Sequence, residues 1–217
     1  SSAASDVYKR QFQFAVGLFE GYTGNANQSD DPLFATRLAY NFLDKEQNPA
    51  YFTSSTYFGK AGDILTVGFA AQYQGDGYGT ATQSGSFTGY VFDGLFEKPL
   101  ANGAALTIEG EYKDFDVDTQ ATTPDFPMFE GKSYFGTVAY LIGGTTGIGK
   151  YQPYLRFTTN DPSAGESSSL TEIGLNYVID GHNLRMNLNY TTGDANLTGV
   201  KAPQDIDTIL FGLQYQI

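Results

Sequence analysis

The chain has 217 residues with 12 basic and 24 acidic side chains, a net charge of −12, no cysteine and a single histidine. This balance argues against nucleic acid as a partner, because it leaves no basic patch to neutralise phosphates. The lack of cysteine excludes disulfides and thiolate metal sites. No apolar run reaches the roughly 18 residues of a membrane-spanning helix. Abundant tyrosine, phenylalanine and glycine instead favour β-structure with many turns, and a β-barrel is compatible with this composition.

The first eleven residues, SSAASDVYKRQ, resemble the translation of a common transposon-type sequencing adapter. We interpret residues 1–11 as a non-native, adapter-derived segment, which is excluded from fold reasoning in the way a tag is. The alternative is a genuine mature N-terminus. On the adapter interpretation, residues 12–217 are the C-terminal part of a single β-barrel domain whose earlier strands are missing.

Apolar and polar side chains alternate with a period of two from Phe12 onward. The pattern is clearest in HNLRMNLNYTT, where Leu184 and Leu188 share one face and Arg185 and Asn187 share the other. Helical periodicity of any length is absent, and no shift in composition marks a second domain. The alternation predicts ten strands, at 12–22, 33–43, 63–74, 85–97, 103–115, 132–142, 149–159, 168–179, 182–192 and 205–217.

The connections between these strands alternate in length, as in outer-membrane barrels with long extracellular loops and short periplasmic turns. If the C-terminus lies on the periplasmic side, 116–131 and 193–205 are long loops, 75–84 is a glycine- and aspartate-rich loop, and 98–102 is a short turn. The stretch 44–62 breaks the alternation because it is too long for an ordinary periplasmic turn. We expect a short extra strand or a helix within it.

The positions of the aromatic residues distinguish a membrane barrel from a soluble β-sandwich. The apolar face of a sandwich is its core, with aromatics at all depths, whereas the apolar face of a membrane barrel meets lipid and its aromatics gather at strand ends. Here Tyr40, Tyr134 and Tyr190 lie toward segment ends, and Val138 and Leu188 lie in the middles. This favours an all-β, antiparallel transmembrane β-barrel in the bacterial outer membrane. The alternative is a soluble, secreted β-sandwich that binds carbohydrate through exposed aromatics.

Two blocks of the sequence resemble the phosphate-selective porin O/P family. They are TYFGKAGDILTVG, at 56–68, and LFEKPLANGAALTIEGEY, at 95–112. The resemblance implies a barrel of about 16 strands, wide enough for an aqueous channel, of which the ten predicted strands are the last ten. It also implies a homotrimer in outer-membrane lipid and lipopolysaccharide. Such a porin passes small hydrophilic solutes, including anions such as phosphate, without a cofactor and without catalysing a reaction.

Charged side chains on the inward face of the predicted strands are the candidates for pore lining. A guanidinium fork matches phosphate oxygens bidentately, and rings of charge set pore selectivity. Carboxylates oppose the basic residues here, so the set predicts no clear preference. The alternative is that these side chains pair across strands and stiffen the wall. The eight candidates are Arg37, Asp93, Glu109, Glu111, Lys113, Arg156, Glu172 and Arg185.

We predict no catalytic or metal site. Glu109 and Glu111 lie two apart on one strand face and resemble paired acid–base carboxylates, but alternating lumen residues of a porin produce such pairs without chemistry. His182 follows Asp180 and Gly181, which supply turn geometry, so we expect a turn residue rather than a ligand or a base. The aspartate-rich loops lack the ordered spacing of a calcium-binding loop.

Overall fold

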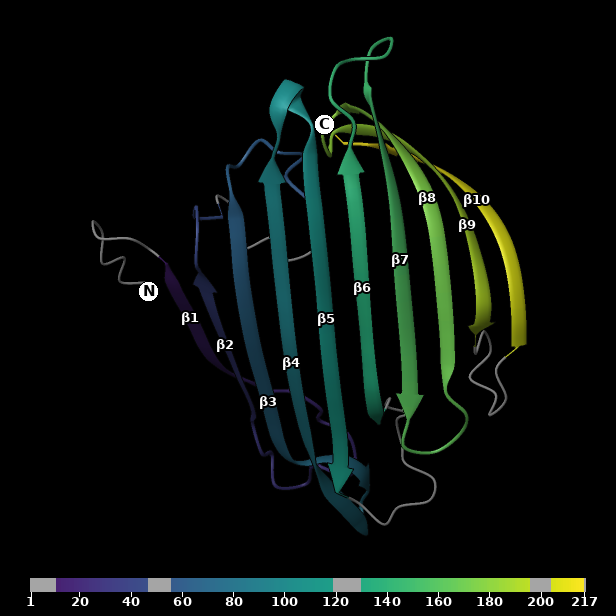
Figure 1. Ribbon diagram of the computed structural model, residues 1–217. Helices are drawn as coiled ribbons and strands as arrows, with labels where there is room; N and C mark the ends of the chain where they lie inside the picture. The colour runs from purple at the N-terminus through teal and green to yellow at the C-terminus, as the bar shows by residue number, and fades with distance from the viewer. Residues whose placement is uncertain (1–10, 47–55, 119–129, 196–203, 217) are drawn as a thin grey trace.

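The structure, a computed structural model, describes residues 11–46, 56–118, 130–195 and 204–216, which form one antiparallel β-sheet (Figure 1). Each strand pairs with its neighbours in chain order, so the sheet is a meander without crossovers. The strands are β1 (Phe12–Phe19), β2 (Leu33–Asn41), β3 (Ile64–Thr80), β4 (Gln83–Pro99), β5 (Ala105–Asp118), β6 (Gly131–Leu141), β7 (Lys150–Pro162), β8 (Ser168–Asp180), β9 (Leu184–Ala195) and β10 (Gln204–Tyr215). The prediction of ten antiparallel strands is therefore confirmed.

Little other regular structure accompanies the sheet in the described part of the chain. A single 3-10 turn, η1 (Ala101–Gly103), connects β4 to β5. None of the described residues forms a helix long and apolar enough to cross a membrane. Residues 1–10, most of the segment interpreted as adapter-derived, lie outside the described residues.

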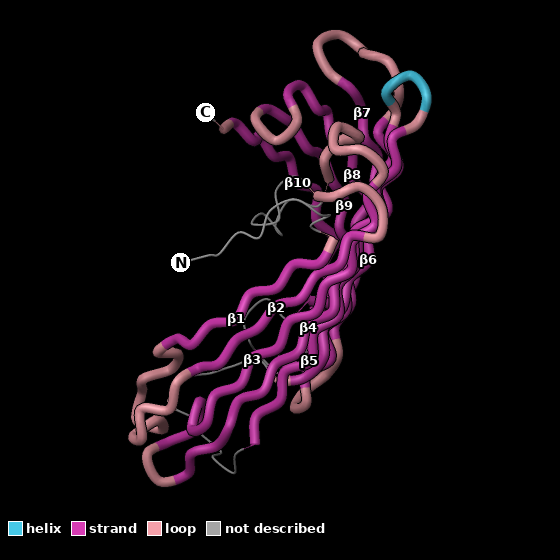
Figure 2. Tube along the Cα trace, turned by 90° about the vertical axis from the view of Figure 1, so that its left-hand side faces the viewer, coloured by secondary structure: helices cyan, strands magenta, loops and turns pink. Residues whose placement is uncertain are grey.

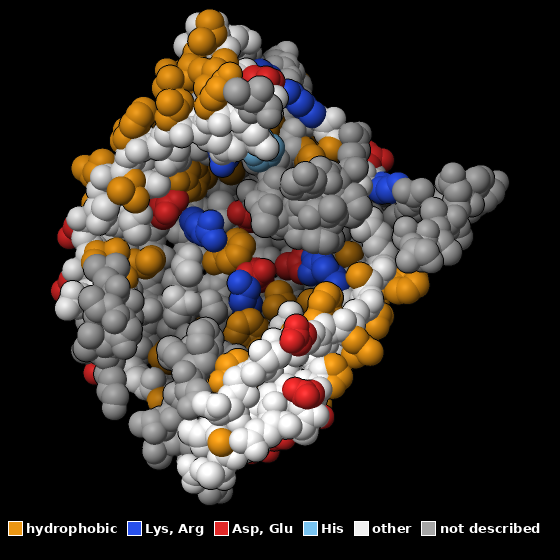
Figure 3. Space-filling model, turned by 180° about the vertical axis from the view of Figure 1, so that it is seen from behind, with side chains coloured by type: hydrophobic (Ala, Val, Ile, Leu, Met, Phe, Trp, Pro, Cys, Tyr) orange, Lys and Arg blue, Asp and Glu red, His pale blue; other side chains and the backbone are white. Residues whose placement is uncertain are grey.

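The sheet is curved, with a hollow face and an outer face (Figures 1 and 2). Seen from behind, acidic and basic side chains gather in the hollow, and hydrophobic side chains follow the outer surface (Figure 3). β1 and β10 are the outermost strands, and the described strands do not close into a ring. The structure is therefore an open section of curved wall.

The outer face is apolar and exposed along its length. Phe14 is 72% exposed, Ile173 60% and Phe211 70%, and all three belong to the outward set of the two-residue alternation. A β-sandwich would cover such a face with a second sheet, but all the described strands belong to one sheet. An exposed apolar face of this extent is typical of contact with lipid. This arrangement supports a barrel wall and disfavours the sandwich alternative.

A small cluster of buried apolar side chains lies on the inner face of the sheet. It consists of Phe58, Ala105, Leu141 and Val178. Phe58 comes from the 44–62 connection, and the other three come from β5, β6 and β8. The connection therefore packs against the inner face of the sheet.

One of the predicted connections differs from the structure. The expected loop at 75–84 is mostly strand, because β3 runs to Thr80, β4 begins at Gln83, and a register shift between Gln74 and Tyr78 absorbs the irregularity. Cross-strand pairing overrides the local turn preference of its glycines. In the described parts of 44–62 there is neither a helix nor a named strand, only an isolated bridge between Asp44 and Ile64. Residues 47–55 lie outside the described residues.

The apolar outer face predicts that a charged side chain placed on it destabilises the folded protein in lipid. We expect Leu155→Arg, at a side chain 51% exposed on the outer face, to destabilise the folded protein in lipid by about 2–4 kcal/mol, the usual cost of arginine near the bilayer midplane of a barrel. The measurement is urea unfolding in lipid vesicles. Thr158→Arg, on the same strand but on the face of Arg156, is the matched control and should cost much less. Equal losses for the two variants would contradict a lipid-facing outer surface.

Candidate functional site

All eight sequence-predicted pore-lining residues lie on the hollow face of the sheet. The pairing registers place Arg37 beside Ala70 and Asp93 beside Gly68, and place Glu172 opposite Arg156. Each of these charged residues belongs to the less exposed of the two alternating sets of side chains on its strand. The apolar residues next to it in the sequence belong to the more exposed set. The residues lie on six strands, and are Arg37 on β2, Asp93 on β4, Glu109, Glu111 and Lys113 on β5, Arg156 on β7, Glu172 on β8 and Arg185 on β9.

Four of the eight candidates are joined in ion pairs. The guanidinium of Arg37 donates two hydrogen bonds to Asp93, at 2.7 and 2.8 Å, across β3. Lys113 lies 2.7 Å from Glu111 on the same strand face. Bidentate pairing of this kind fixes side-chain geometry, and each pair leaves little net charge facing the hollow. These four residues therefore stiffen the wall and contribute little to the electrostatic field in the hollow.

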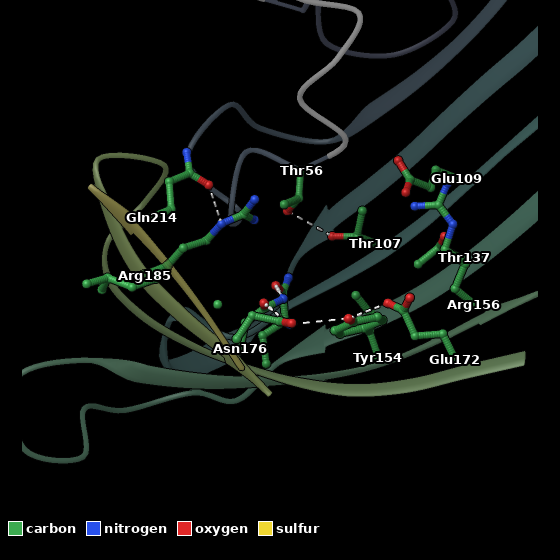
Figure 4. A pocket seen from close by; sticks show the side chains of 15 residues that line it. Thr56, Thr107, Glu109, Thr137, Tyr154, Arg156, Glu172, Asn176, Arg185 and Gln214 are labelled. Carbon is green, nitrogen blue, oxygen red and sulfur yellow. Dashed lines mark hydrogen bonds between the residues drawn. The ribbon is translucent and has the colours of Figure 1, made fainter. Parts of the chain in front are cut away.

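The other four candidates line a pocket of about 380 Å³ on the hollow face, which spans β5 to β10 (Figure 4). Arg156 lies over the ring of Phe135, 4.2 Å from its centroid, and near Glu109 (Figure 4). Arg185 donates from Nε to Oε1 of Gln214 at 2.7 Å. Among the described residues, neither arginine is in an ion pair within 4 Å. Two guanidinium groups and two carboxylates therefore face one space.

Uncharged polar side chains complete the pocket, and the sequence analysis did not select them. Gln152 and Tyr154 of β7, Asn176 of β8 and Asn187 of β9 all line it. The Tyr154 hydroxyl donates to Glu172 and accepts from Asn187 at 3.2 Å. The alternation of the sequence places Asn187 on the same strand face as Arg185, so these amides can be identified from the sequence when uncharged polar residues are considered together with the charged ones.

Glu97 holds the inner end of the 44–62 connection against the wall. Its side chain is fully buried, at 0% exposure. The carboxylate accepts from the hydroxyls of Thr56 at 2.6 Å and Thr107 at 2.8 Å, and from the backbone N–H groups of Tyr57 at 3.1 Å and Gly59 at 2.8 Å. No basic side chain pairs with it among the described residues. Charge-assisted hydrogen bonds satisfy the buried charge instead.

Residues 56–59, named here the inward segment, contain a strained backbone conformation. Phe58 has φ +55°, a left-handed conformation that costs on the order of 1–3 kcal/mol in a non-glycine residue. Its ring packs in the buried cluster and lies 4.9 Å from the ring of His182. The Glu97 hydrogen bonds on both sides of Phe58 fix the conformation. Because Thr56 also lines the pocket, the inward segment forms part of its boundary.

His182 and Tyr57 tie the inward segment to two further parts of the sheet. His182 lies in the turn after β8, as predicted, and its Nε2 is 2.7 Å from the carbonyl oxygen of Thr56, so Nε2 carries the proton and donates. The Tyr57 hydroxyl donates to Glu46 at 2.7 Å. Burial, followed by this bond, raises the pKa of Tyr57 above its usual range. These bonds give His182 a structural role beyond the turn.

The described residues show no group of three His, Cys, Asp or Glu side chains that could hold a metal ion. Glu109 lines the pocket while Glu111 pairs with Lys113. The geometry therefore separates the two carboxylates that resembled an acid–base pair.

Comparison with known proteins gave one match. A family model described as phosphate-selective porin O and P matches residues 2–217. No curated protein and no solved structure matched the chain. The family resemblance found in two sequence blocks is thus confirmed over nearly the whole chain.

The Glu97 contacts predict a local release of the inward segment. Glu97→Ala removes the acceptor for four donor groups and leaves buried donors without a partner, so we expect a loss of about 3 kcal/mol in unfolding free energy. We also expect faster tryptic cleavage at the exposed Lys60. Asp63→Asn is the control, because the Asp63 side chain lies in an exposed pair with Lys98, at 3.5 Å, and the backbone hydrogen bonds of Asp63 with Asp44 do not involve the Asp63 carboxylate. Equal cleavage rates in the two variants would show that Glu97 does not hold the segment.

Proposed function

Because the chain belongs to the phosphate-selective porin O and P family, we propose that it lines an aqueous channel for the passive diffusion of small hydrophilic solutes, including anions such as phosphate. Membership implies a bacterial outer-membrane protein, and a channel rather than an enzyme. The observation that carries the proposal is the division of the sheet into a charged, amide-bearing hollow face and an exposed apolar outer face. A wall between water and lipid needs this division.

The contacts of the eight charged candidates support a division of roles among them. The pairs Arg37–Asp93 and Lys113–Glu111 largely neutralise themselves. Arg156 and Arg185 carry guanidinium groups toward the pocket and are the residues that would attract an anion. Glu109 and Glu172 line the same pocket and oppose that attraction. We therefore propose a mixed field in which the two arginines favour anions locally.

We further propose that the ten strands form part of the wall of a wider barrel, about 16 strands in all. The open edges of β1 and β10 support this proposal, because hydrocarbon offers no water to satisfy the N–H and C=O groups of an unpaired edge. The resemblance to the family supports a homotrimer surrounded by outer-membrane lipid and lipopolysaccharide.

Charge removal at the pocket tests the selectivity. We expect the double variant Arg156→Gln, Arg185→Gln to lower the anion-to-cation permeability ratio by about five-fold per charge, since two unit charges 4 Å apart in water interact by about 1 kcal/mol. The measurement is the reversal potential of the assembled channel in a planar bilayer under a KCl gradient.

Lys98→Gln is the matched control for this experiment. It removes one positive charge from an exposed side chain outside the pocket, and the permeability ratio should stay the same. If the two variants change the ratio equally, or the double variant leaves it unchanged, the arginines do not set the local field. Absence of discrete conductance steps from the complete barrel that contains these ten strands would contradict the channel itself.

A further inference from the structure

A chain of side-chain amides crosses the pocket wall from β9 to β7. Asn189 donates from Nδ2 to Oδ1 of Asn187 at 3.0 Å, Asn187 donates to Asn176 at 2.9 Å, and Asn176 donates to Oε1 of Gln152 at 3.1 Å. These three amide-to-amide hydrogen bonds all run in one direction, from Asn189 toward Gln152. Tyr154 joins the chain from the side, since its hydroxyl accepts from Asn187. Figure 4 shows Asn176 and Tyr154 lying toward one another in the pocket.

The amide chain has a surplus donor at one end and a surplus acceptor at the other. Gln152 is 1% exposed and lines the pocket, and its Nε2 has no hydrogen-bond partner in the described protein. Oδ1 of Asn189 likewise has no hydrogen-bond partner in the described protein. Neither does the hydroxyl of Thr137, a residue that lines the pocket. Flipping the Gln152 amide, which exchanges the positions of its oxygen and nitrogen, would break the hydrogen bond that it accepts from Asn176. Most buried polar groups in folded proteins have a partner, and Gln152 and Thr137 both line the pocket, so their amide donor and hydroxyl are the groups that a solute in the pocket would satisfy.

From this arrangement we propose that the pocket binds a neutral, polyhydroxylated solute, a sugar or polyol, during its passage. The inference rests on the proposed channel function and names a solute class for it. Each hydroxyl of such a solute donates one hydrogen bond and accepts others. The pocket offers amide and guanidinium donors together with amide, hydroxyl and carboxylate acceptors. Its volume of about 380 Å³ lies within the roughly 300–1,000 Å³ of small-molecule sites.

Phosphate fits this pocket less well than a sugar does. Glu109 and Glu172 lie in the same lining as Arg156 and Arg185 and oppose the attraction of the two guanidinium groups for an anion, whereas a neutral solute meets no such opposition. Inorganic phosphate near neutral pH carries fewer hydroxyl hydrogens than a sugar does, so it can donate hydrogen bonds to fewer of the acceptors in the pocket. The carboxylates instead match the hydroxyl donors of a sugar.

The test uses D-glucose as the probe and inorganic phosphate as the comparison, with the assembled channel in planar bilayers. We expect glucose to reduce the ion current in a saturable manner. Gln152→Met and, separately, Asn187→Leu should each weaken the apparent affinity for glucose by about five-fold, the usual scale for losing one or two hydrogen bonds. Thr158→Val, on the same strand face but outside the pocket, is the matched control and should leave the affinity unchanged.

The possible outcomes separate the inference from the channel proposal. Discrete conductance steps without saturable glucose block would overturn the inference and keep the channel. Glucose block that the pocket variants leave unchanged would also overturn it. Phosphate block that the same variants weaken, without glucose block, would make the pocket an anion site instead. If Gln152→Met fails to assemble, Asn187→Leu tests the same chain from its other side.

Discussion

The two-residue alternation of the strand is the constraint on which the rest of this structure depends. Each strand must present apolar side chains on one face and polar ones on the other, while its backbone groups pair with the neighbouring strands. Ten strands paired in chain order meet this requirement with a single curved sheet. The apolar core of a globular protein is therefore replaced by an exposed apolar outer face, and the polar side chains are collected in the hollow.

Buried polar contacts shape that hollow. Glu97 is fully buried, and its carboxylate accepts hydrogen bonds from four donor groups, which hold the inward segment against the wall. The ring of Phe58 in this segment packs against the ring of His182. The inward segment meets the pocket at its first residue, Thr56, which also belongs to the pocket lining. The shape of the pocket is thus coupled to the stability of one connection, and the ion pair Arg37–Asp93 fixes a separate part of the wall.

The sequence predicted the features that depend on local periodicity. Strand positions and the inward orientation of residues such as Arg156 and Arg185 follow from the period of two, because a shift by one residue would move every side chain to the other face. Contacts that depend on distant pairing could not be predicted. Thr56 meets Glu97 across 41 residues, and Arg37 meets Asp93 across 56. The strand through 75–84 was missed because its glycines signal a turn locally, while pairing with β4 decides the structure.

The measurement that tests the account most directly is thiol labelling along β7. The chain has no cysteine, so single cysteines can be placed at Leu155, Arg156, Phe157 and Thr158 without removing others. The account predicts that a membrane-impermeant, water-soluble thiol reagent labels positions 156 and 158 of the protein assembled in membranes and leaves 155 and 157 unlabelled. Uniform labelling of the four positions, or the opposite alternation, would contradict a wall with water on the hollow face and lipid on the outer face.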